Sequence, residues 1–249
     1  MGLTPVWRLR ERAATAERAL ADAPAASNEQ RATGDESRLS EAERRRAAIM
    51  RLDWAALKAR VASCTDCPLH EKRNKTVFGV GDERAEWVFV GEGPGADEDA
   101  RGEPFVGQAG KLLDNMLAAI QLKRGENVFI CNVVKCRPPG NRNPERSEAL
   151  ACEPYLHRQI ELIKPRLIVA LGRIAAANLL ATDASIASLR GRIHRYRGIP
   201  LIVTYHPAYL LRNLPDKAKA WADLCFAVGV MRDLQSGKAA DNRESVKGE

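Results

Sequence analysis

The sequence predicts an α/β protein, a three-layer α/β/α sandwich around a central, mainly parallel four-stranded sheet. Four apolar runs have the length of strands and show no polar alternation, which is typical of strands covered on both faces. Segments with helical spacing separate these runs, as parallel connections require. Three of the runs end in chemically unusual residues, GEGPG, CNVVKC and TYHPAY, and parallel sheets place their sites at such strand ends.

The individual elements can be assigned from the N-terminus onwards. The predicted helices, in which apolar residues recur three and four positions apart, are 41–63, 108–122, 147–163, 173–181 and 215–233. The predicted buried strands are 86–93, 127–134, 166–172 and 199–207. The segment RIHRYRG, residues 192–198, alternates basic and apolar residues and is predicted to be an edge strand.

Composition divides the chain into three parts. Residues 1–45 form an N-terminal extension that we expect to be partly disordered, because residues 20–40 contain almost no large apolar side chain. Residues 46–235 form the folded domain. Residues 236–249 are polar and are expected to form a flexible tail.

The net charge of +7 resides in the folded part of the chain. Residues 51–232 contain 27 Lys and Arg against 20 Asp and Glu. This excess suits a polyanion such as nucleic acid, although many basic domains bind none. Because no apolar run could span a membrane and the first residues lack the apolar core of a secretion signal, we expect a protein of the cytoplasm, at the bacterial nucleoid, without membrane contact. We also expect a monomer.

The loop GEGPGADEDARGEPFVGQAG, residues 91–110, lies between a predicted strand and a predicted helix, where backbone N–H groups often bind phosphate. Its spacing matches neither GxGxxG nor GxxxxGK[ST]. It also carries five acidic residues, which would repel a phosphate: Glu92, Asp97, Glu98, Asp99 and Glu103. The loop is therefore predicted to bind something other than a phosphate.

Six cysteines are present, and disulfides are not expected in a chain without a secretion signal. Cys131 and Cys225 lie in apolar surroundings and are interpreted as buried thiols. The other four comprise one CxxC motif and two dispersed residues: Cys64, Cys67, Cys136 and Cys152. They fit scattered core cysteines, a Cys₄ zinc site or an iron–sulfur cluster. The single CxxC fits a cluster better than a zinc ribbon, which uses two such motifs, but spacing alone leaves the metal open.

A family resemblance rests on six motifs in a fixed order. They are CTDCPL, GEGPGADEDARGEPFVGQAGKLLD, CNVVKCRPPGNRNP, CEPYL, PRLIVALG and TYHPAYLLRN, and they extend over residues 50–232. In these motifs the chain resembles the family 4 uracil-DNA glycosylases. The resemblance implies a three-layer α/β/α fold, a [4Fe–4S] cluster on Cys64, Cys67, Cys136 and Cys152, and repair of uracil-containing DNA, single- or double-stranded, by a hydrolase that leaves an abasic site.

Uracil is a flat, neutral ring with two carbonyls and one N3–H group, and the motifs offer matching groups. Phe105 can stack on a base that has been flipped out of the helix. The Asn132 amide can donate to O4 and accept N3–H, whereas cytosine presents the reverse pattern. His206 can bond O2 and stabilise the negative charge that builds up as the glycosidic bond breaks. Structural roles, as a core ring, a turn cap and a buried histidine respectively, are the alternatives.

The group that handles the attacking water is less evident. In the family 1 enzymes an Asp orients this water, and Gly93 occupies its position here. We assign the role to Glu92, with Glu98 shaping the pocket and Gly93 lining the base site. Family 1 also excludes the thymine methyl group with a Tyr where this chain has Gly95, so Glu98 is the candidate for that exclusion.

The YLLR segment is predicted to contact DNA. Leu210 or Leu211 would act as a wedge in the vacated base stack, and Arg212 would bind a phosphate. Arg190, Arg192 and Arg195 would lie along the predicted edge strand, where a solvated edge explains them nearly as well. Two alternative functions remain, a covalently trapping uracil-DNA-binding protein and a non-catalytic iron–sulfur or zinc DNA-binding protein.

Overall fold

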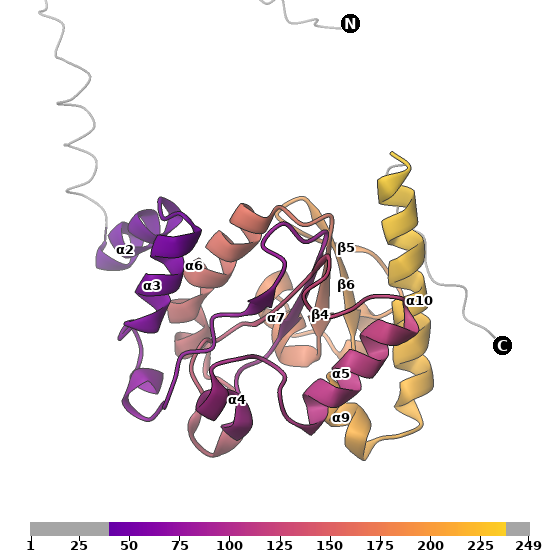
Figure 1. The fold of residues 1–249 in the computed structure, drawn as a ribbon, viewed down its shortest axis with the longest axis horizontal. Coiled ribbons are helices and arrows are strands. Elements are labelled where there is room, and N and C mark those ends of the chain that lie inside the picture. The colour runs from indigo at the N-terminus through magenta and orange to yellow at the C-terminus, as the bar shows by residue number, and fades with distance from the viewer. Residues whose placement is uncertain (1–39, 238–249) are drawn as a thin grey trace, which may run out of the picture. The chain divides into compact units, whose positions relative to one another are not determined.

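The computed structural model describes residues 40–237 and contains, in that part of the chain, a six-stranded sheet of order β1-β3-β2-β4-β6-β5 (Figure 1). The strands are β1 (Val80–Gly81), β2 (Trp87–Gly91), β3 (Val128–Asn132), β4 (Leu167–Leu171), β5 (His194–Tyr196) and β6 (Ile199–Thr204). The inner four are parallel, which confirms the predicted parallel centre. The short β1 and β5 pair antiparallel at the two edges. β5 lies within the predicted edge segment, whereas β1 was not predicted.

The helices of the described part connect and cover these strands. They are α2 (Glu41–Met50), α3 (Trp54–Ala62), α4 (Ala96–Arg101), α5 (Gln108–Ala119), α6 (Arg146–Ile163), α7 (Arg173–Leu180), α8 (Ile186–Leu189), α9 (Pro207–Arg212) and α10 (Asp216–Gln235), with two 3₁₀ turns, η1 (Pro68–Glu71) and η2 (Pro139–Asn141). The helix predicted over 41–63 is divided in two. The break falls at Asp53, whose side chain accepts the Ala56 N–H and so starts α3 as an N-cap. The short α4, α8 and α9 were not predicted.

The side chains of the sheet alternate between two apolar layers, and this alternation produces the three-layer sandwich. Val88 and Val90 of β2 belong to the layer formed with α3, α6 and α7. Trp87 and Phe89 of the same strand belong to the layer formed with α5 and α10. Figure 1 shows these two groups of helices on opposite sides of the sheet. Every residue of β2, β3 and β4 is buried, as the uninterrupted apolar runs predicted.

The register brings the carboxyl ends of the parallel strands to one edge of the sheet. Gly91 at the end of β2 pairs with Asn132 at the end of β3, and Leu171 of β4 pairs with Thr204 of β6. The three motifs at the predicted strand ends therefore open on the same side.

The chain divides into two units between Arg45 and Arg46, and the sheet belongs entirely to the second. Of the N-terminal extension predicted over residues 1–45, residues 41–45 lie in α2, and the expected partial disorder otherwise concerns residues outside the described part. The same holds for most of the flexible tail expected over residues 236–249. Within residues 40–237, no helix has both the length and the apolar character needed to cross a membrane. Cys131 is buried as predicted, but the prediction for Cys225 is wrong, because this thiol lies on an exposed face of α10.

Candidate active site

A cavity of about 450 Å³ opens at the carboxyl ends of β2, β3 and β6. The loops after these strands and the first turns of α9 form its walls. All six residues predicted to contact the base line it: Glu92, Gly93, Glu98, Phe105, Asn132 and His206. These residues are far apart in the sequence, and the parallel register of the sheet brings them together.

Asn132 lines this cavity and carries an unpaired polar atom. It ends β3, and its side chain is only 2% exposed. Its Oδ1 has no hydrogen-bond partner among the described residues. A buried polar atom without a partner costs about 1–3 kcal/mol, so such atoms are rare in folded proteins unless a ligand satisfies them. The geometry therefore favours the predicted base contact over a turn cap.

His206 is held as a neutral hydrogen-bond donor. It is the N-cap of α9, and its Nδ1 accepts the Ala208 N–H at 3.1 Å. Because Nδ1 accepts, the proton of the neutral ring must be on Nε2. Desolvation, aided by the positive charge of Arg212, lowers the pKa of His206 to about 4. At neutral pH the ring thus offers an uncharged Nε2–H donor.

Phe105 adopts a backbone conformation that the surrounding residues must maintain. Its φ is 54°, in the left-handed region that non-glycine residues rarely adopt. Arg124 binds the carbonyls of Pro104 and Phe105, each at 2.8 Å. A Cβ atom at Gly110 would lie 1.8 Å from the carbonyl oxygen of Phe105, so only glycine at this position allows α5 to pack against the Phe105 backbone. The ring stacks beside His206 with centroids 5.5 Å apart at 30°, and backbone strain of this kind is typical of functional sites.

The acidic residues of the glycine-rich loop bind its own backbone. Glu98 accepts the N–H groups of Gly95 at 3.0 Å, Val106 at 2.9 Å and Gly107 at 3.2 Å. Its carboxylate therefore ties the start of α4 to the segment that carries Phe105. These contacts give Glu98 the predicted role of shaping the pocket.

Asp99 has a similar role at the back of the loop. It is fully buried and accepts two hydrogen bonds from Asn74, from the backbone N–H at 2.9 Å and from Nδ2 at 2.7 Å. The sequence alone does not reveal this pairing, because the partners lie 25 residues apart.

Glu92, the residue predicted to handle the attacking water, directly follows β2 and is partly buried. It lines the cavity, and burial raises its pKa while the charge of Arg173 opposes the rise. At the neighbouring position, a Cβ atom on Gly93 would lie 2.8 Å from Cγ2 of Val134. A side chain at Gly93, where the family 1 enzymes have their Asp, would therefore require Val134 to move.

The structure separates the two candidate wedge residues of α9. Leu210 is 1% exposed and packs against Met116 and Leu224, so its prediction as a DNA wedge is not supported. Leu211 is 41% exposed. Arg212 is exposed and lines the rim of the cavity. Of the pair, Leu211 has the accessibility that insertion requires.

Arg190 lies inside a network and not along the edge strand as predicted. Its Nε donates to Asp223 at 2.7 Å, and its guanidinium lies 4.9 Å from the centroid of the Tyr205 ring. The buried Asp223 also accepts from Oγ1 of Thr204 at 2.8 Å. Arg190 and Asp223 therefore fix the segment that leads from β6 to His206.

Sequence reasoning missed one wall of the cavity, the loop between Cys136 and α6. Asn141, Arg142 and Asn143 line the cavity here. Arg142 makes a bidentate ion pair with the buried Glu148, at 2.8 and 2.6 Å. The Asn- and Pro-rich composition of this loop was the available signal.

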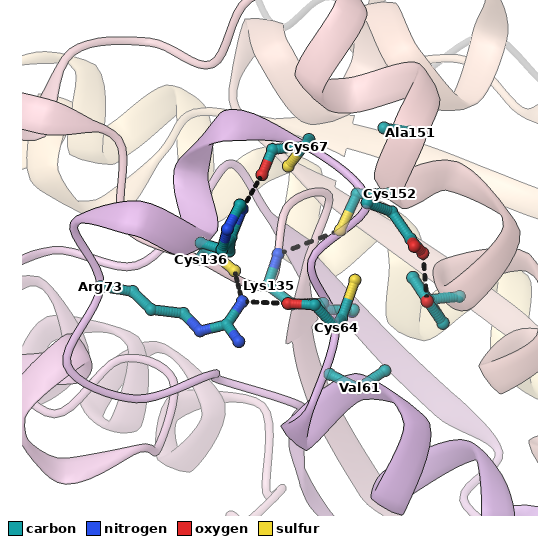
Figure 2. Close-up of a pocket in the computed structure, with 11 residues that line it drawn as sticks. Val61, Cys64, Cys67, Arg73, Lys135, Cys136, Ala151 and Cys152 are labelled. Atoms are coloured by element: carbon teal, nitrogen blue, oxygen red, sulfur yellow. Dashed lines mark hydrogen bonds between the residues drawn. The ribbon is translucent and has the colours of Figure 1, made fainter.

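The four grouped cysteines line a second, smaller cavity, shown in Figure 2. They come from the turn after α3, the segment after β3 and the interior of α6: Cys64, Cys67, Cys136 and Cys152. Arg73 Nη1 donates to Cys136 Sγ at 3.1 Å and to the Cys64 carbonyl at 2.7 Å. The backbone N–H of Lys135 donates to Cys152 Sγ at 3.3 Å. The four cysteines therefore gather around one cavity, which disfavours the interpretation as scattered core cysteines.

The spacing of these thiols bears on which metal they suit. Among residues 40–237, no three His, Cys, Asp or Glu side chains converge closely enough to hold one metal ion. A Cys₄ zinc site needs all four sulfurs about 2.3 Å from a single centre. The thiols instead surround a cavity, and hydrogen-bond donors reach two of the sulfurs, which is typical of sites for iron–sulfur clusters. The residues present therefore fit a cluster of several irons better than they fit zinc.

Comparison with known proteins gives a consistent set of relatives. The family model of the uracil DNA glycosylase superfamily matches residues 78–225. The chain is 49% identical to the type-4 uracil-DNA glycosylase of Archaeoglobus fulgidus, over 61% of this chain and 79% of that protein. It is 44% identical to the type-4 enzyme of Thermotoga maritima, over 74% and 93% of the two chains. It is 41% identical to that of Pyrobaculum aerophilum, over 75% and 100%.

Proposed function

The chain belongs to the uracil-DNA glycosylase superfamily, and from this premise we propose that it flips uracil out of DNA and hydrolyses the N-glycosidic bond, leaving an abasic site. The observation that carries the proposal is the buried amide of Asn132, a residue that lines the cavity and whose Oδ1 has no partner among the described residues. Uracil O4 and N3–H are the complement that would satisfy it. A cytosine there would place donor against donor, and a site built on hydrogen bonds rejects such a mismatch strongly.

Two aromatic rings complete the base site. Phe105 offers a face for stacking, and His206 beside it offers Nε2–H to uracil O2. As the bond between N1 and C1′ breaks, its electron pair stays on the uracil, and negative charge spreads to O2 and O4. A preorganised neutral donor at O2 stabilises this charge without first giving up a proton.

The second half of the reaction needs a nucleophile at C1′. We assign Glu92 to orient the attacking water and to accept its proton as the new C–O bond forms. Its raised pKa, caused by burial, makes this carboxylate a better base than an exposed one. The uracil anion then takes a proton from solvent as it leaves, and Glu92 returns its proton to solvent.

We assign the rim of the cavity as the place where the flipped nucleotide enters. Leu211 is the exposed apolar side chain that would fill the vacated stack. Arg212, next to it, makes no ion pair with the described residues and is available for a phosphate. We therefore propose uracil in single- or double-stranded DNA as the substrate class.

The four cysteines are assigned as ligands of a [4Fe–4S] cluster. When bound, such a cluster would cross-link three parts of the chain. These are the turn with Cys64 and Cys67, the segment with Cys136, and helix α6 with Cys152. The chain between Cys136 and Cys152 carries the cavity wall with Asn141 and Arg142. The cross-link thus holds one wall of the substrate site, and glycosidic hydrolysis requires no electron transfer.

An assay on a labelled single-stranded oligonucleotide with one deoxyuridine tests the proposal. Incubation followed by hot alkali should cleave the strand at that position, and matched strands with thymine or cytosine should remain intact. His206→Ala, purified in parallel, controls for contaminating glycosylase. A protein–DNA adduct that resists denaturation and stands in place of the alkali-labile abasic site, with uracil released as the adduct forms at C1′, would favour the trapping alternative. Uracil-DNA binding without cleavage would favour the non-catalytic one.

A further inference from the structure

Lys135 is a fully buried cation that the proposed mechanism does not use. It lies between Val134 and Cys136 and is 1% exposed. Its Nζ donates to the backbone carbonyl of Asn132 at 2.8 Å. Its backbone N–H donates to Cys152 Sγ, as Figure 2 shows. One residue thus contacts both the base-reading strand end and the cysteine cavity.

A buried ammonium needs a counter-charge, because leaving one unpaired in the interior is costly. Among the described residues, no carboxylate forms an ion pair with Lys135. Burial lowers the pKa of Lys135, and the groups whose negative charge opposes this fall are the thiolates of Cys131, Cys152 and Cys136. Two of these belong to the cysteine cavity that Lys135 itself lines. Four thiolates outweigh the positive charge of a four-iron core, so a bound cluster would place net negative charge in the cavity that Lys135 lines.

The position of Asn132 depends on the same ammonium. The amide side chain makes no bond through Oδ1 to the described residues, so its aim depends on the backbone that carries it. On one side that backbone is held by β2. On the other side, beyond the end of the strand, Lys135 holds the Asn132 carbonyl. The carbonyl of Lys135 is in turn fixed by the Val77 N–H at 2.7 Å.

We propose that Lys135 is a positioning residue, which supplies the counter-charge for the cysteine-bound cluster and, through the Asn132 carbonyl, fixes the amide that reads the base. The inference rests on the proposed function. It goes further because it couples the two sites. Without the negative charge of the cluster, the buried Lys135 ammonium would be destabilised, and its movement would break the hydrogen bond to the Asn132 carbonyl.

The test uses the full-length holoprotein, purified anaerobically, and three variants. Lys135→Met removes the charge and the donor at similar length. Lys135→Gln removes the charge and keeps an N–H donor. Arg73→Gln is the matched control, because Arg73 also contacts a cluster ligand, Cys136, but has no bond to Asn132.

The first measurement is the midpoint potential of the bound cluster, followed by its visible absorption. Removal of a nearby buried cation disfavours the more negative reduced state, so both Lys135 variants should show a lower potential than the parent protein. Arg73→Gln should shift in the same direction. An unchanged potential in the Lys135 variants would overturn the counter-charge assignment. If both lose iron while folded and Arg73→Gln retains it, the assignment is supported.

The second measurement is kcat/KM on the deoxyuridine oligonucleotide. Lys135→Met should lose about tenfold or more, as expected when a hydrogen bond to a buried carbonyl is removed. Lys135→Gln should lose less, and Arg73→Gln should lose least. If Lys135→Met does not fold, Lys135→Gln decides. A lowered potential with parental kcat/KM in the folded Lys135 variant would refute the coupling to Asn132. A parent protein without uracil excision would instead refute the proposed function, and the potentials would still test the counter-charge.

Discussion

Substitution of Gly91 by alanine tests the geometry of the base site directly. Gly91 ends β2 beside Asn132 and has an ordinary extended backbone, so alanine adds one methyl group without backbone strain. That Cβ would lie 2.4 Å from Oδ1 of Asn132 and 2.5 Å from Cζ of Phe105. Ordinary contacts begin at 3.4 Å, so the amide and the ring must each retreat by about 1 Å.

The expected effect on catalysis is large and the effect on stability is small. A misplacement of about 1 Å in a positioned group can cost about 100-fold in rate, and both groups assigned to the base move here. We therefore expect kcat/KM for uracil excision to fall about 100-fold. Overpacking should cost about 1–3 kcal/mol of the free energy of unfolding, which leaves the protein folded at assay temperature.

The assay compares initial rates on a labelled deoxyuridine oligonucleotide with thermal unfolding followed by circular dichroism. Gly229→Ala in α10 is the matched control, because nothing lies within 4 Å of its added Cβ. That variant should keep the parental kcat/KM. A folded Gly91→Ala protein with the parental rate would refute the placement of Asn132 and Phe105 around the base.

Four further outcomes are expected. Asn132→Asp should lose most uracil excision and gain trace excision of cytosine; a folded variant with the parental uracil rate would show that another group reads the base. His206→Ala should slow excision by about 10²–10³-fold while binding of uracil-DNA changes far less, and a parental rate would remove this ring from the mechanism. Excision should fall on acidification when Glu92 gains a proton, at a pH above the ordinary glutamate range because burial raises its pKa, while His206 stays neutral down to about pH 4; Glu92→Gln should abolish this acid limb. Cys64→Ala should lose iron and solubility whereas Cys225→Ala, on the surface, should keep both, and native protein with stoichiometric zinc and no iron would contradict the cluster assignment.

The parallel centre of the sheet could be predicted from sequence because burial on both faces leaves an unambiguous mark. The residues of β2, β3 and β4 read as uninterrupted apolar runs, and a strand of that kind needs helices on each side. The site followed from the fold, since parallel strands with unusual carboxyl ends must bring those ends together. Asn132 and His206 are therefore close in space although more than seventy positions separate them in the sequence.

Side-chain direction and long-range pairing could not be predicted in the same way. Leu210 and Leu211 are equivalent in composition, and only the packing of α9 against α5 and α10 buries the first. Cys225 lies among apolar residues of α10, yet periodicity over a helix with several faces in contact did not reveal that it points outward. The roles of Arg190 and Lys135 depend on partners that only the tertiary structure brings near.

Acidic residues in the loop beside a cavity proposed to bind DNA can be explained by the groups that their carboxylates contact. The carboxylates of Glu98 and Asp99 are occupied by hydrogen bonds within the protein. Glu98 holds the segment that carries Phe105, and Asp99 holds Asn74 behind the loop. Two exposed arginines line the cavity: Arg142, which is paired with Glu148, and Arg212, which we propose binds a backbone phosphate. Uracil itself is neutral, so the interior of the site needs donors, acceptors and a stacking face in place of cations. A loop that clamps phosphate would have the opposite design, with free N–H groups and no carboxylates to occupy them. The same glycines that allow close backbone approach in phosphate loops here make room for Asn132 and Phe105, because any side chain at Gly91 would occupy the place of the base-reading amide.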